Sequence, residues 1–252
     1  MRLSEVIRKS ITLLTTIKPN EEKEEWSATE ISRELNIPVQ TVHRLLSSLE
    51  EYGFVFKNKE TKKFRLGLTL LQLGLSIRDN LLVRNSALPI MKKLGSKTKE
   101  NVYLTVPEGH EGIFIDCINF SQLLQNSEPI GMRGPLCTGA SNKVILAYTS
   151  RKAKQRIIRR LVEKSEVKDL KKLEEDLRNI RKCGIAISFE DITERTVSIA
   201  APIFSWEDKV VAAISVIGPD TSLTESRLKD IISLTERAAE EISEELGSIK
   251  RR

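Results

Sequence analysis

Apolar side chains recur with a helical period in three segments of the first fifty residues. Between residues 4 and 18 they lie three or four positions apart, and Ile31 and Leu35 share one face of a shorter segment. The third segment carries Val42, Leu45, Leu46 and Leu49 at the same period. This pattern predicts three helices, the first of which packs behind the other two.

The residues between these segments indicate where the helices begin and end. Ser27 and Glu30 have the spacing of a capping box, in which a hydroxyl and a carboxylate bind free backbone amides at a helix start. Asn36 tolerates the left-handed conformation of a tight turn, and Pro38 favours a helix start. Gly53 marks the end of the third helix. A tight turn therefore joins the second helix to the third.

Two short β-like runs, 54–56 and 63–66, follow the third helix and flank the polar turn 57–62. Helix, turn, helix and basic hairpin in this order are typical of a winged helix-turn-helix. We therefore interpret residues 1–67 as a DNA-binding domain. The alternative is an ordinary pair of packed helices with a solvated, charged hairpin.

The outward face of the third helix carries hydrogen-bonding groups and no carboxylate through residue 49. A recognition helix enters the major groove with its N-terminal residues, where Gln and Arg pair with adenine and guanine edges. We expect Gln40, Thr41 and Arg44 to contact bases, and His43 and Ser47 to contact phosphates. The basic hairpin suits further phosphates, whereas the acidic loop 19–25 should lie away from DNA. The predicted DNA-contacting residues are Ser27, Val39, Gln40, Thr41, His43, Arg44, Ser47, Lys57, Lys59, Lys62, Lys63 and Arg65.

A leucine-rich segment, 68–83, separates this domain from the rest of the chain. Its leucines fall on more than one helical face. The segment is either a helix buried within one chain or a linker helix that packs on a second copy. We favour the second, because proteins that read DNA grooves commonly dimerise to contact two half-sites. The predicted domain boundaries are then 1–67, 68–83 and 84–252.

The second half of the chain alternates helical and strand-like patterns, which predicts an α+β domain. A helix should end near Gly95, followed by a β-hairpin of residues 102–106 and 112–118. Charged amphipathic helices are expected at 152–163 and 167–183, and strands at 185–189, 197–204 and 210–217. Ser222 and Glu225 have capping-box spacing before a last long helix.

Small residues around Gly139 lead into a further helix, whose first amides are free either to hold an anion or simply to begin a plain helix. Gly134 and Gly139 resemble a phosphate loop in spacing, but the lysine comes four residues late. Ser188, Ser198 and Ser215 lie among apolar neighbours on the three strand-like runs. Their hydroxyls bind neighbouring carbonyls or line one polar pocket with the helix start.

Composition limits the remaining possibilities. The net charge of +6 and pI near 9.2 permit a nucleic-acid partner. Cys117, Cys137 and Cys183 cannot all pair and form no C-x-x-C motif, which indicates a reduced cytoplasm. The sequence shows neither a secretory signal nor the roughly 18 unbroken apolar residues of a membrane span. We expect no cofactor, and no metal at His110, because the chain has only two histidines.

The order of features resembles the IclR family of prokaryotic transcription regulators over nearly the whole chain. The resemblance is carried by the runs 41–46, 64–67, 135–147, 199–204 and 212–219. It implies a winged helix-turn-helix, a linker helix and a GAF-like effector domain with an antiparallel sheet flanked by helices. It also implies dimers, often paired into tetramers, that bind a double-stranded DNA operator.

The resemblance further implies a small-molecule effector, an organic acid or aromatic compound, that changes operator affinity. The family's pocket corresponds to Ala140, Ser141, Ser188, Ser198, Ser215 and Ile217. Some relatives carry an acidic residue in place of Ser188 and a hydroxyl in place of Ile217, and Asn142 replaces a usual glycine.

Two other functions are compatible with parts of the sequence. A hydrolase-like enzyme could use Cys137 or Ser141 as nucleophile, but His110 is the only histidine in the second half that could serve as its base. Glu190, Asp191 and Glu194 are acidic alternatives without triad-like spacing. A constitutive DNA binder without a ligand is the other possibility. The prediction is a ligand-responsive, sequence-specific transcription regulator that is not an enzyme.

Overall fold

The computed structural model describes residues 5–20, 23–120, 129–189, 195–222 and 225–248. The chain divides into two compact units, Met1–Asp79 and Asn80–Arg252, which are considered separately. The first unit therefore includes the linker segment as far as Asp79. Within the described residues no helix is long and apolar enough to cross a membrane.

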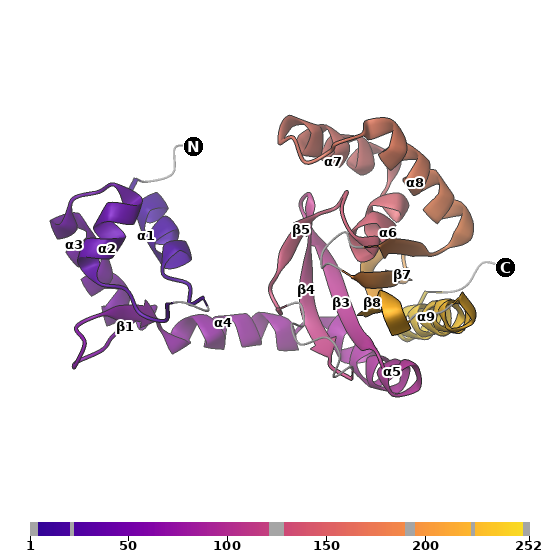
Figure 1. Cartoon of the computed structure of the whole chain (residues 1–252), viewed down its shortest axis with the longest axis horizontal. Helices are drawn as coiled ribbons and strands as arrows, with labels where there is room; N and C mark the ends of the chain where they lie inside the picture. Colours follow the sequence, from indigo (N-terminus) through magenta and orange to yellow (C-terminus); the bar gives the residue numbers. More distant parts are fainter. Residues whose placement is uncertain (1–4, 21–22, 121–128, 190–194, 223–224, 249–252) are drawn as a thin grey trace. The chain divides into compact units, whose positions relative to one another are not determined.

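The first unit contains a three-helix core and a two-stranded hairpin (Figure 1). Its elements are α1 (Glu5–Thr16), α2 (Ala28–Leu35), α3 (Val39–Glu51), β1 (Val55–Lys57), β2 (Phe64–Leu66) and α4 (Leu68–Asp79). Leu13, Ile31 and Leu46 are fully buried between the three helices, and Val55 and Phe64 bring the hairpin onto the same core. The predicted winged helix-turn-helix architecture is confirmed.

The helix α1 packs only by its second half. Leu13 and Ile17 are fully buried, whereas Val6, Ile7 and Ile11 are each more than half exposed. The predicted packing of this helix behind the other two is therefore confirmed at Leu13, whereas the apolar side chains of its first two turns are exposed.

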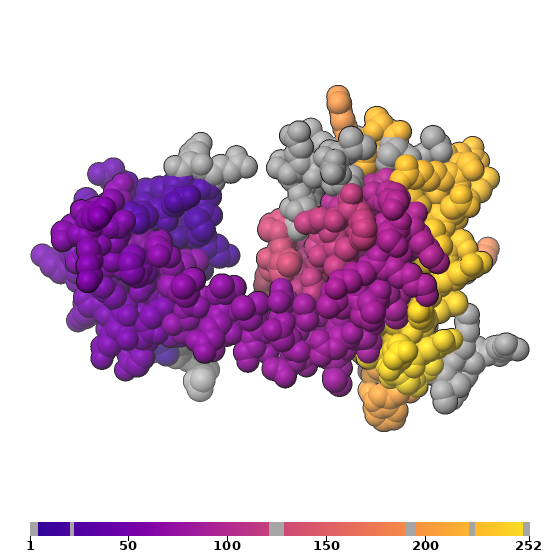
Figure 2. Space-filling view, turned by 90° about the horizontal axis from the view of Figure 1, so that it is seen from below, coloured from indigo at the N-terminus to yellow at the C-terminus, as the bar shows by residue number. Residues whose placement is uncertain are grey.

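The leucine-rich helix α4 has no buried residue. Its atoms lie at the surface of the face that Figure 2 draws. Leu68, Leu71 and Ile77 are 71%, 57% and 68% exposed. The alternative of a helix buried within one chain is excluded by this exposure. The helix is also shorter than the predicted 68–83 segment, because α4 ends at Asp79 and a new helix begins at Leu82.

The second unit is built on a six-stranded antiparallel sheet in the order β5-β4-β3-β8-β7-β6. Its strands are β3 (Asn101–Glu108), β4 (Glu111–Ile118), β5 (Arg133–Pro135), β6 (Ala186–Phe189), β7 (Thr196–Phe204) and β8 (Val210–Pro219). Its helices are α5 (Leu82–Thr98), α6 (Ala140–Tyr148), α7 (Arg151–Glu163), α8 (Leu170–Cys183) and α9 (Glu225–Glu245), with a short 3-10 turn, η1 (Asp220–Ser222), before α9.

Helices cover both faces of this sheet (Figure 1). On one face, α5 and α9 pack on Leu104, Ile199 and Ile214. On the other, α6 and α8 pack on the small side chains of Ala186, Ala200 and Ala213. Alanines at these positions let α6 approach the sheet closely, which places the N-terminus of α6 against the strands.

Two predicted details of this unit require comment. The helix expected to end near Gly95 continues to Thr98 and ends at Lys99, whose φ is 58°. Gly95 instead makes room for the Phe120 ring, which would lie 2.2 Å from a Cβ at that position. The predicted cap of the last helix spans 222–225, and its side chains at 222–224 lie outside the described residues.

Candidate nucleic-acid interface and effector site

Local hydrogen bonds determine where α2 begins and where it ends. The Ser27 amide and hydroxyl both donate to Glu30 Oε2, at 2.7 and 2.8 Å, and the Glu30 amide donates to Ser27 Oγ at 3.3 Å. These contacts and Lys23 lower the pKa of Glu30 to about 2. Asn36 ends α2 with φ 51° and ψ 48°, as predicted. The Ser27 hydroxyl is thus engaged in the cap of α2.

The N-terminal half of α3 presents the polar face predicted from the sequence. Gln40, His43, Arg44 and Ser47 are exposed, and Thr41 is half-buried. Val39 packs partly against the core of the unit, so it is less available to a ligand than its neighbours. No acidic residue occurs in the first turn of α3, whose free amides and dipole favour an anion.

The hairpin presents most of its cations to solvent. Lys59, Lys62 and Lys63 are exposed, and Lys62 sits at positive φ in the turn. The other two cations lie over aromatic rings: Lys57 Nζ is 5.5 Å from the Phe64 centroid and Arg65 Cζ is 4.4 Å from the Phe56 centroid. These contacts restrain the two inner cations.

The acidic loop does not lie apart from this interface throughout its length. Glu25 Oε1 accepts a hydrogen bond from Asn58 Nδ2 at 2.8 Å, and Glu25 Oε2 accepts one from Thr61 Oγ1 at 2.7 Å. Residues 19–25 were expected to lie away from DNA, yet Glu25 contacts the turn of the hairpin that is predicted to bind phosphates. Charge alone suggested repulsion from phosphate, and no sequence pattern indicates hydrogen-bond partners more than thirty residues away.

In the second unit, strand register gathers the predicted effector residues on the α6 face of the sheet. Ser188 on β6 pairs with Ser198 on β7, which pairs with Ile217 on β8. Ser215 lies two residues along β8 and pairs with Tyr103 on β3. All four predicted strand residues are therefore neighbours on one face, and each is at most 8% exposed.

The start of α6 adds backbone donors to this face. Gly139 precedes the helix with φ 79° and ψ 156°, and the Lys143 amide is the first to donate back along the helix, to the Gly139 oxygen at 3.0 Å. The amides of Ala140 and Ser141 have no acceptor within the helix. Ala140 and Ser141 are 0% and 1% exposed, so the start of α6 is buried.

Several buried polar atoms on this face lack hydrogen-bond partners among the described residues. They include the hydroxyls of Ser198 and Ser215, Asn142 Oδ1, and one atom that the sequence did not single out, Thr105 Oγ1. Buried polar groups are nearly always hydrogen-bonded, so this concentration favours a bound water or a polar ligand. Thr105 could have been predicted by the same signal as the serines, a hydroxyl within an apolar strand.

Asn142 fits this site because two glycines lie beneath it. A Cβ on Gly112 would fall 2.0 Å from Asn142 Oδ1, and one on Gly134 would fall 3.2 Å from Asn142 Nδ2. The Asn142 side chain is therefore held over β4 and β5. Tyr103 and Phe114, with ring centroids 5.2 Å apart, and Ile217 form an apolar wall nearby.

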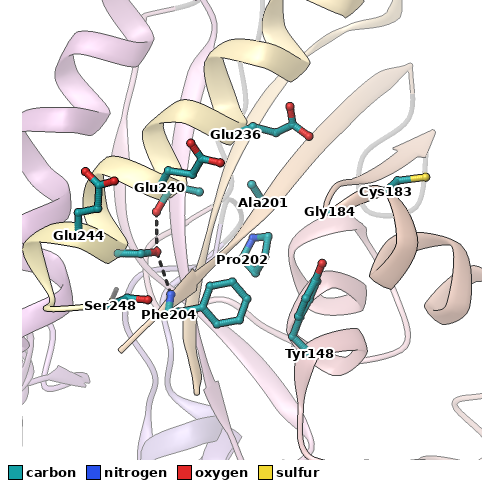
Figure 3. A pocket seen from close by; sticks show the side chains of 12 residues that line it. Tyr148, Cys183, Gly184, Ala201, Pro202, Phe204, Glu236, Glu240, Glu244 and Ser248 are labelled. Atoms are coloured by element: carbon teal, nitrogen blue, oxygen red, sulfur yellow. Dashed lines mark hydrogen bonds between the residues drawn. The ribbon is translucent and has the colours of Figure 1, made fainter. Parts of the chain in front are cut away.

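Three cavities formed by described residues have volumes of about 320, 330 and 430 Å³, and none of the three is lined by the six predicted effector residues. The cavity in Figure 3 lies between α9 and the end of β7, with the rings of Tyr148 and Phe204 in edge-to-face contact at 5.2 Å. Glutamates of α9 line its rim. Such a rim disfavours a carboxylate ligand.

The hydrolase alternative finds little support in the geometry. Burial raises the pKa of the Cys137 thiol, and Cys137 Sγ lies 3.5 Å from the Glu166 carbonyl oxygen. His110 Nε2 instead lies 2.7 Å from Lys164 Nζ. The acidic candidates Glu190, Asp191 and Glu194 lie outside the described residues. The cysteines of the described chain are free.

Comparison with known proteins matches both units. The family model "IclR helix-turn-helix domain" matches residues 6–58, and "Bacterial transcriptional regulator IclR C-terminal" matches residues 76–244. The HTH-type transcriptional regulator KipR of Bacillus subtilis (strain 168) is 32% identical over 215 residues, covering 84% of this chain and 86% of KipR. KdgR of Escherichia coli (strain K12) is 29% identical over 231 residues, covering 90% of this chain and 88% of KdgR.

Solved structures show the same two-unit fold. The IclR structure from Thermotoga maritima has a TM-score of 0.77 at 27% identity and covers 96% of this chain and 98% of its own. An IclR homolog from Microbacterium hydrocarbonoxydans, complexed with 4-hydroxybenzoate, has a TM-score of 0.79 at 24% identity and covers 96% and 99%.

Proposed function

Because the chain belongs to the IclR family of bacterial transcription regulators, and is a regulator with a helix-turn-helix DNA-binding domain rather than an enzyme, we propose how it reads DNA and responds to a ligand. A dimer places two α3 helices in successive major grooves of an operator. A small carboxylic acid bound on the serine face of the second unit changes the affinity for that operator.

The observation that carries the DNA-binding proposal is the joint exposure of the polar α3 face and the hairpin cations. Gln40 and Arg44 have the length and donors to reach base edges, while Lys59, Lys62 and Lys63 suit the phosphate backbone. A solvated packing unit has no need for a cation-rich hairpin beside a helix face without carboxylates. The individual residue roles remain predictions.

Exposed apolar residues support self-association of the first unit. Leu71 and Ile77 on α4 and Val6 and Ile11 on α1 are each more than half exposed. Burying a leucine or isoleucine side chain contributes about 1.5–3 kcal/mol, so an α4 helix packed on its counterpart would stabilise a dimer. Two recognition helices about 34 Å apart would then meet two half-sites. Pairing of dimers into tetramers is a further part of the proposal.

The unpartnered hydroxyls of Ser198 and Ser215 support a ligand on the α6 face. Free amides at the start of α6 favour the carboxylate, and the wall of Tyr103, Phe114 and Ile217 favours an apolar or aromatic body. The homolog from Microbacterium hydrocarbonoxydans is complexed with 4-hydroxybenzoate, a ligand that has both a carboxylate and an aromatic ring. A ligand with different affinities for two arrangements of the units shifts the population that can span both half-sites.

The DNA-binding proposal is tested with labelled duplex fragments from the chain's own genomic neighbourhood. We expect retention that weakens steeply as salt rises and that survives competition by unrelated duplex. Absence of any salt-sensitive retention would contradict the proposal.

The ligand proposal is tested by thermal shift across a panel of aromatic and aliphatic carboxylic acids, with calorimetry on any that stabilise the chain. Ser198→Ala and Ser215→Ala should lower the affinity for the ligand and leave DNA binding without ligand nearly unchanged. If no acid raises the melting temperature, the constitutive DNA binder becomes the better interpretation.

A further inference from the structure

The turn of the hairpin, residues 58–63, is organised by one asparagine. The Asn58 amide donates to the Lys63 oxygen at 2.8 Å, and the Asn58 oxygen accepts from the Lys62 amide at 3.0 Å. Asn58 Oδ1 accepts from the amides of Glu60 and Thr61, at 2.9 and 3.3 Å. The Asn58 side-chain amide is left to donate outside the turn.

Glu25 receives that donor and a second one from the same turn. Its two carboxylate oxygens accept separately from Asn58 Nδ2 and Thr61 Oγ1, so the carboxylate spans both sides of the turn. These two hydrogen bonds lower the pKa of Glu25, which keeps the carboxylate charged. Hydrogen bonds to a charged acceptor are stronger than those between neutral groups.

The segment that carries Glu25 is itself fixed to the unit. Trp26 and Phe64 exchange backbone hydrogen bonds of 2.8 and 2.7 Å, which adds the segment to the edge of the hairpin. Lys23 Nζ lies 3.7 Å from the Trp26 ring centroid and 2.9 Å from Glu30 Oε1. Glu25 therefore reaches the turn from a braced position beside the capped start of α2.

We propose that Glu25 is a positioning residue for DNA binding, which holds the 58–63 turn in the conformation that presents Lys59, Lys62 and Lys63 to phosphates. The inference rests on the proposed DNA-binding function. A carboxylate repels phosphate, but here the Glu25 carboxylate orders three lysines that attract phosphate. Ordering these lysines before binding reduces the entropy that the complex must lose.

The test compares two neighbouring charge removals. Glu25→Gln removes the carboxylate that contacts the turn, while Glu24→Gln removes an exposed carboxylate for which the described residues offer no hydrogen bond. Both variants lose the same charge within one residue of each other. Thr61→Ala changes no charge; it removes one of the two donors to Glu25, together with the acceptor of the Lys63 amide at 3.3 Å.

Amide hydrogen exchange in the full chain measures the turn directly, without DNA. In Glu25→Gln we expect the amides of Glu60, Thr61 and Lys62 to exchange about two- to tenfold faster, the range set by the loss of one typical hydrogen bond. Glu24→Gln should leave their exchange rates unchanged. Equal exchange in wild type and Glu25→Gln would overturn the proposal.

Duplex binding gives the second readout, using a genomic fragment that the wild type retains in a salt-sensitive way. Glu25→Gln and Thr61→Ala should each bind it about two- to tenfold more weakly, with a shallower salt dependence. Glu24→Gln should bind as tightly as wild type or tighter. If Glu24→Gln and Glu25→Gln both tighten binding equally, Glu25 acts only by charge and the proposal fails. A wild-type chain that binds no duplex refutes the proposed function instead, while the exchange rates still decide whether Glu25 orders the turn.

Discussion

Polar residues in the two units face opposite physical situations. On α3, Gln40 and Arg44 are exposed, so their donors are satisfied by water until DNA replaces it. On the sheet face of the second unit, Ser215 is fully buried and its hydroxyl has no partner among the described residues. The exposed donors on α3 therefore cost little free energy before DNA binds. The unpaired hydroxyl of Ser215 destabilises the folded chain, and a ligand that hydrogen-bonds to it removes that cost.

Arg44 and Lys62 should contribute to DNA binding in different ways. We expect Arg44→Ala to weaken the free energy of binding to the preferred operator by about 1–3 kcal/mol and to relax base preference at one position. Lys62→Ala should weaken binding to all DNA sequences similarly. It should also reduce the slope of log affinity against log salt concentration by about one. Competition binding with operator variants over a salt series measures both effects. Unaltered operator discrimination in Arg44→Ala would show that this side chain contacts no base.

Ser215→Ala should separate stability from ligand binding. Because the hydroxyl is buried without a partner, its removal should leave the free energy of unfolding unchanged or raise it by about 1 kcal/mol. Ser243 is the matched control, since its buried hydroxyl donates to the Ala239 oxygen at 2.6 Å and accepts from the Phe204 amide at 3.0 Å. Ser243→Ala should lower the free energy of unfolding by about 1–3 kcal/mol. Urea denaturation of both variants without ligand measures these free energies of unfolding. An equal loss of stability in the two variants would contradict the prediction.

Among the elements, the turn between α2 and α3 determines how α3 is presented. The left-handed Asn36 and Pro38 confine the chain between the two helices, while the capping box holds the start of α2. Glu30 also connects this cap to Lys23, and through it to the segment that carries Glu25. The helix start and the hairpin are therefore parts of one braced structure.

The Glu30 carboxylate should make the stability of this unit depend on pH. Its pKa is about 2 in the folded chain and 4.5 ordinarily, so its stabilisation is present above about pH 4.5 and is lost as the pH falls through about 2. Wild type should exceed Glu30→Gln in stability at neutral pH, with the difference shrinking from about pH 4.5 downward. Urea unfolding followed by Trp26 fluorescence, with Trp206→Phe in the background, measures it. Glu34→Gln, at an exposed position of α2 outside the capping box, makes the same charge change as a control.

For the whole molecule, the exposed apolar residues of α4 should decide the oligomeric state. We expect wild type to sediment as a dimer or tetramer, and Leu71→Glu, on a side chain 57% exposed, to weaken dimerisation. Affinity for a two-half-site operator should fall with it, because one chain then contacts one half-site. Val162→Glu on α7, 45% exposed, makes the same change elsewhere and should alter neither property. An unchanged sedimentation coefficient for Leu71→Glu would argue against α4 as the interface.

The sequence by itself determined the local structure and the family. Period, caps and turn residues are short-range features, so Ser27, Asn36 and Gly53 predicted α2, its turn and the end of α3 correctly. Ordered motifs along the chain identified the two-part architecture that the comparisons confirm. The serines predicted for the effector site remain predictions of role, although strand register places them on one face.

Only the tertiary structure decided which distant residues meet. Glu25 contacts Asn58 and Thr61 across more than thirty residues, and no periodicity encodes such a pair. Gly95 resembled a helix end, yet it lies within α5 because Phe120 occupies the space beside it. The exposure of α4 likewise depends on what the folded unit leaves uncovered. Propensity acts through neighbours in sequence, whereas packing and burial depend on neighbours in space, which the fold alone specifies.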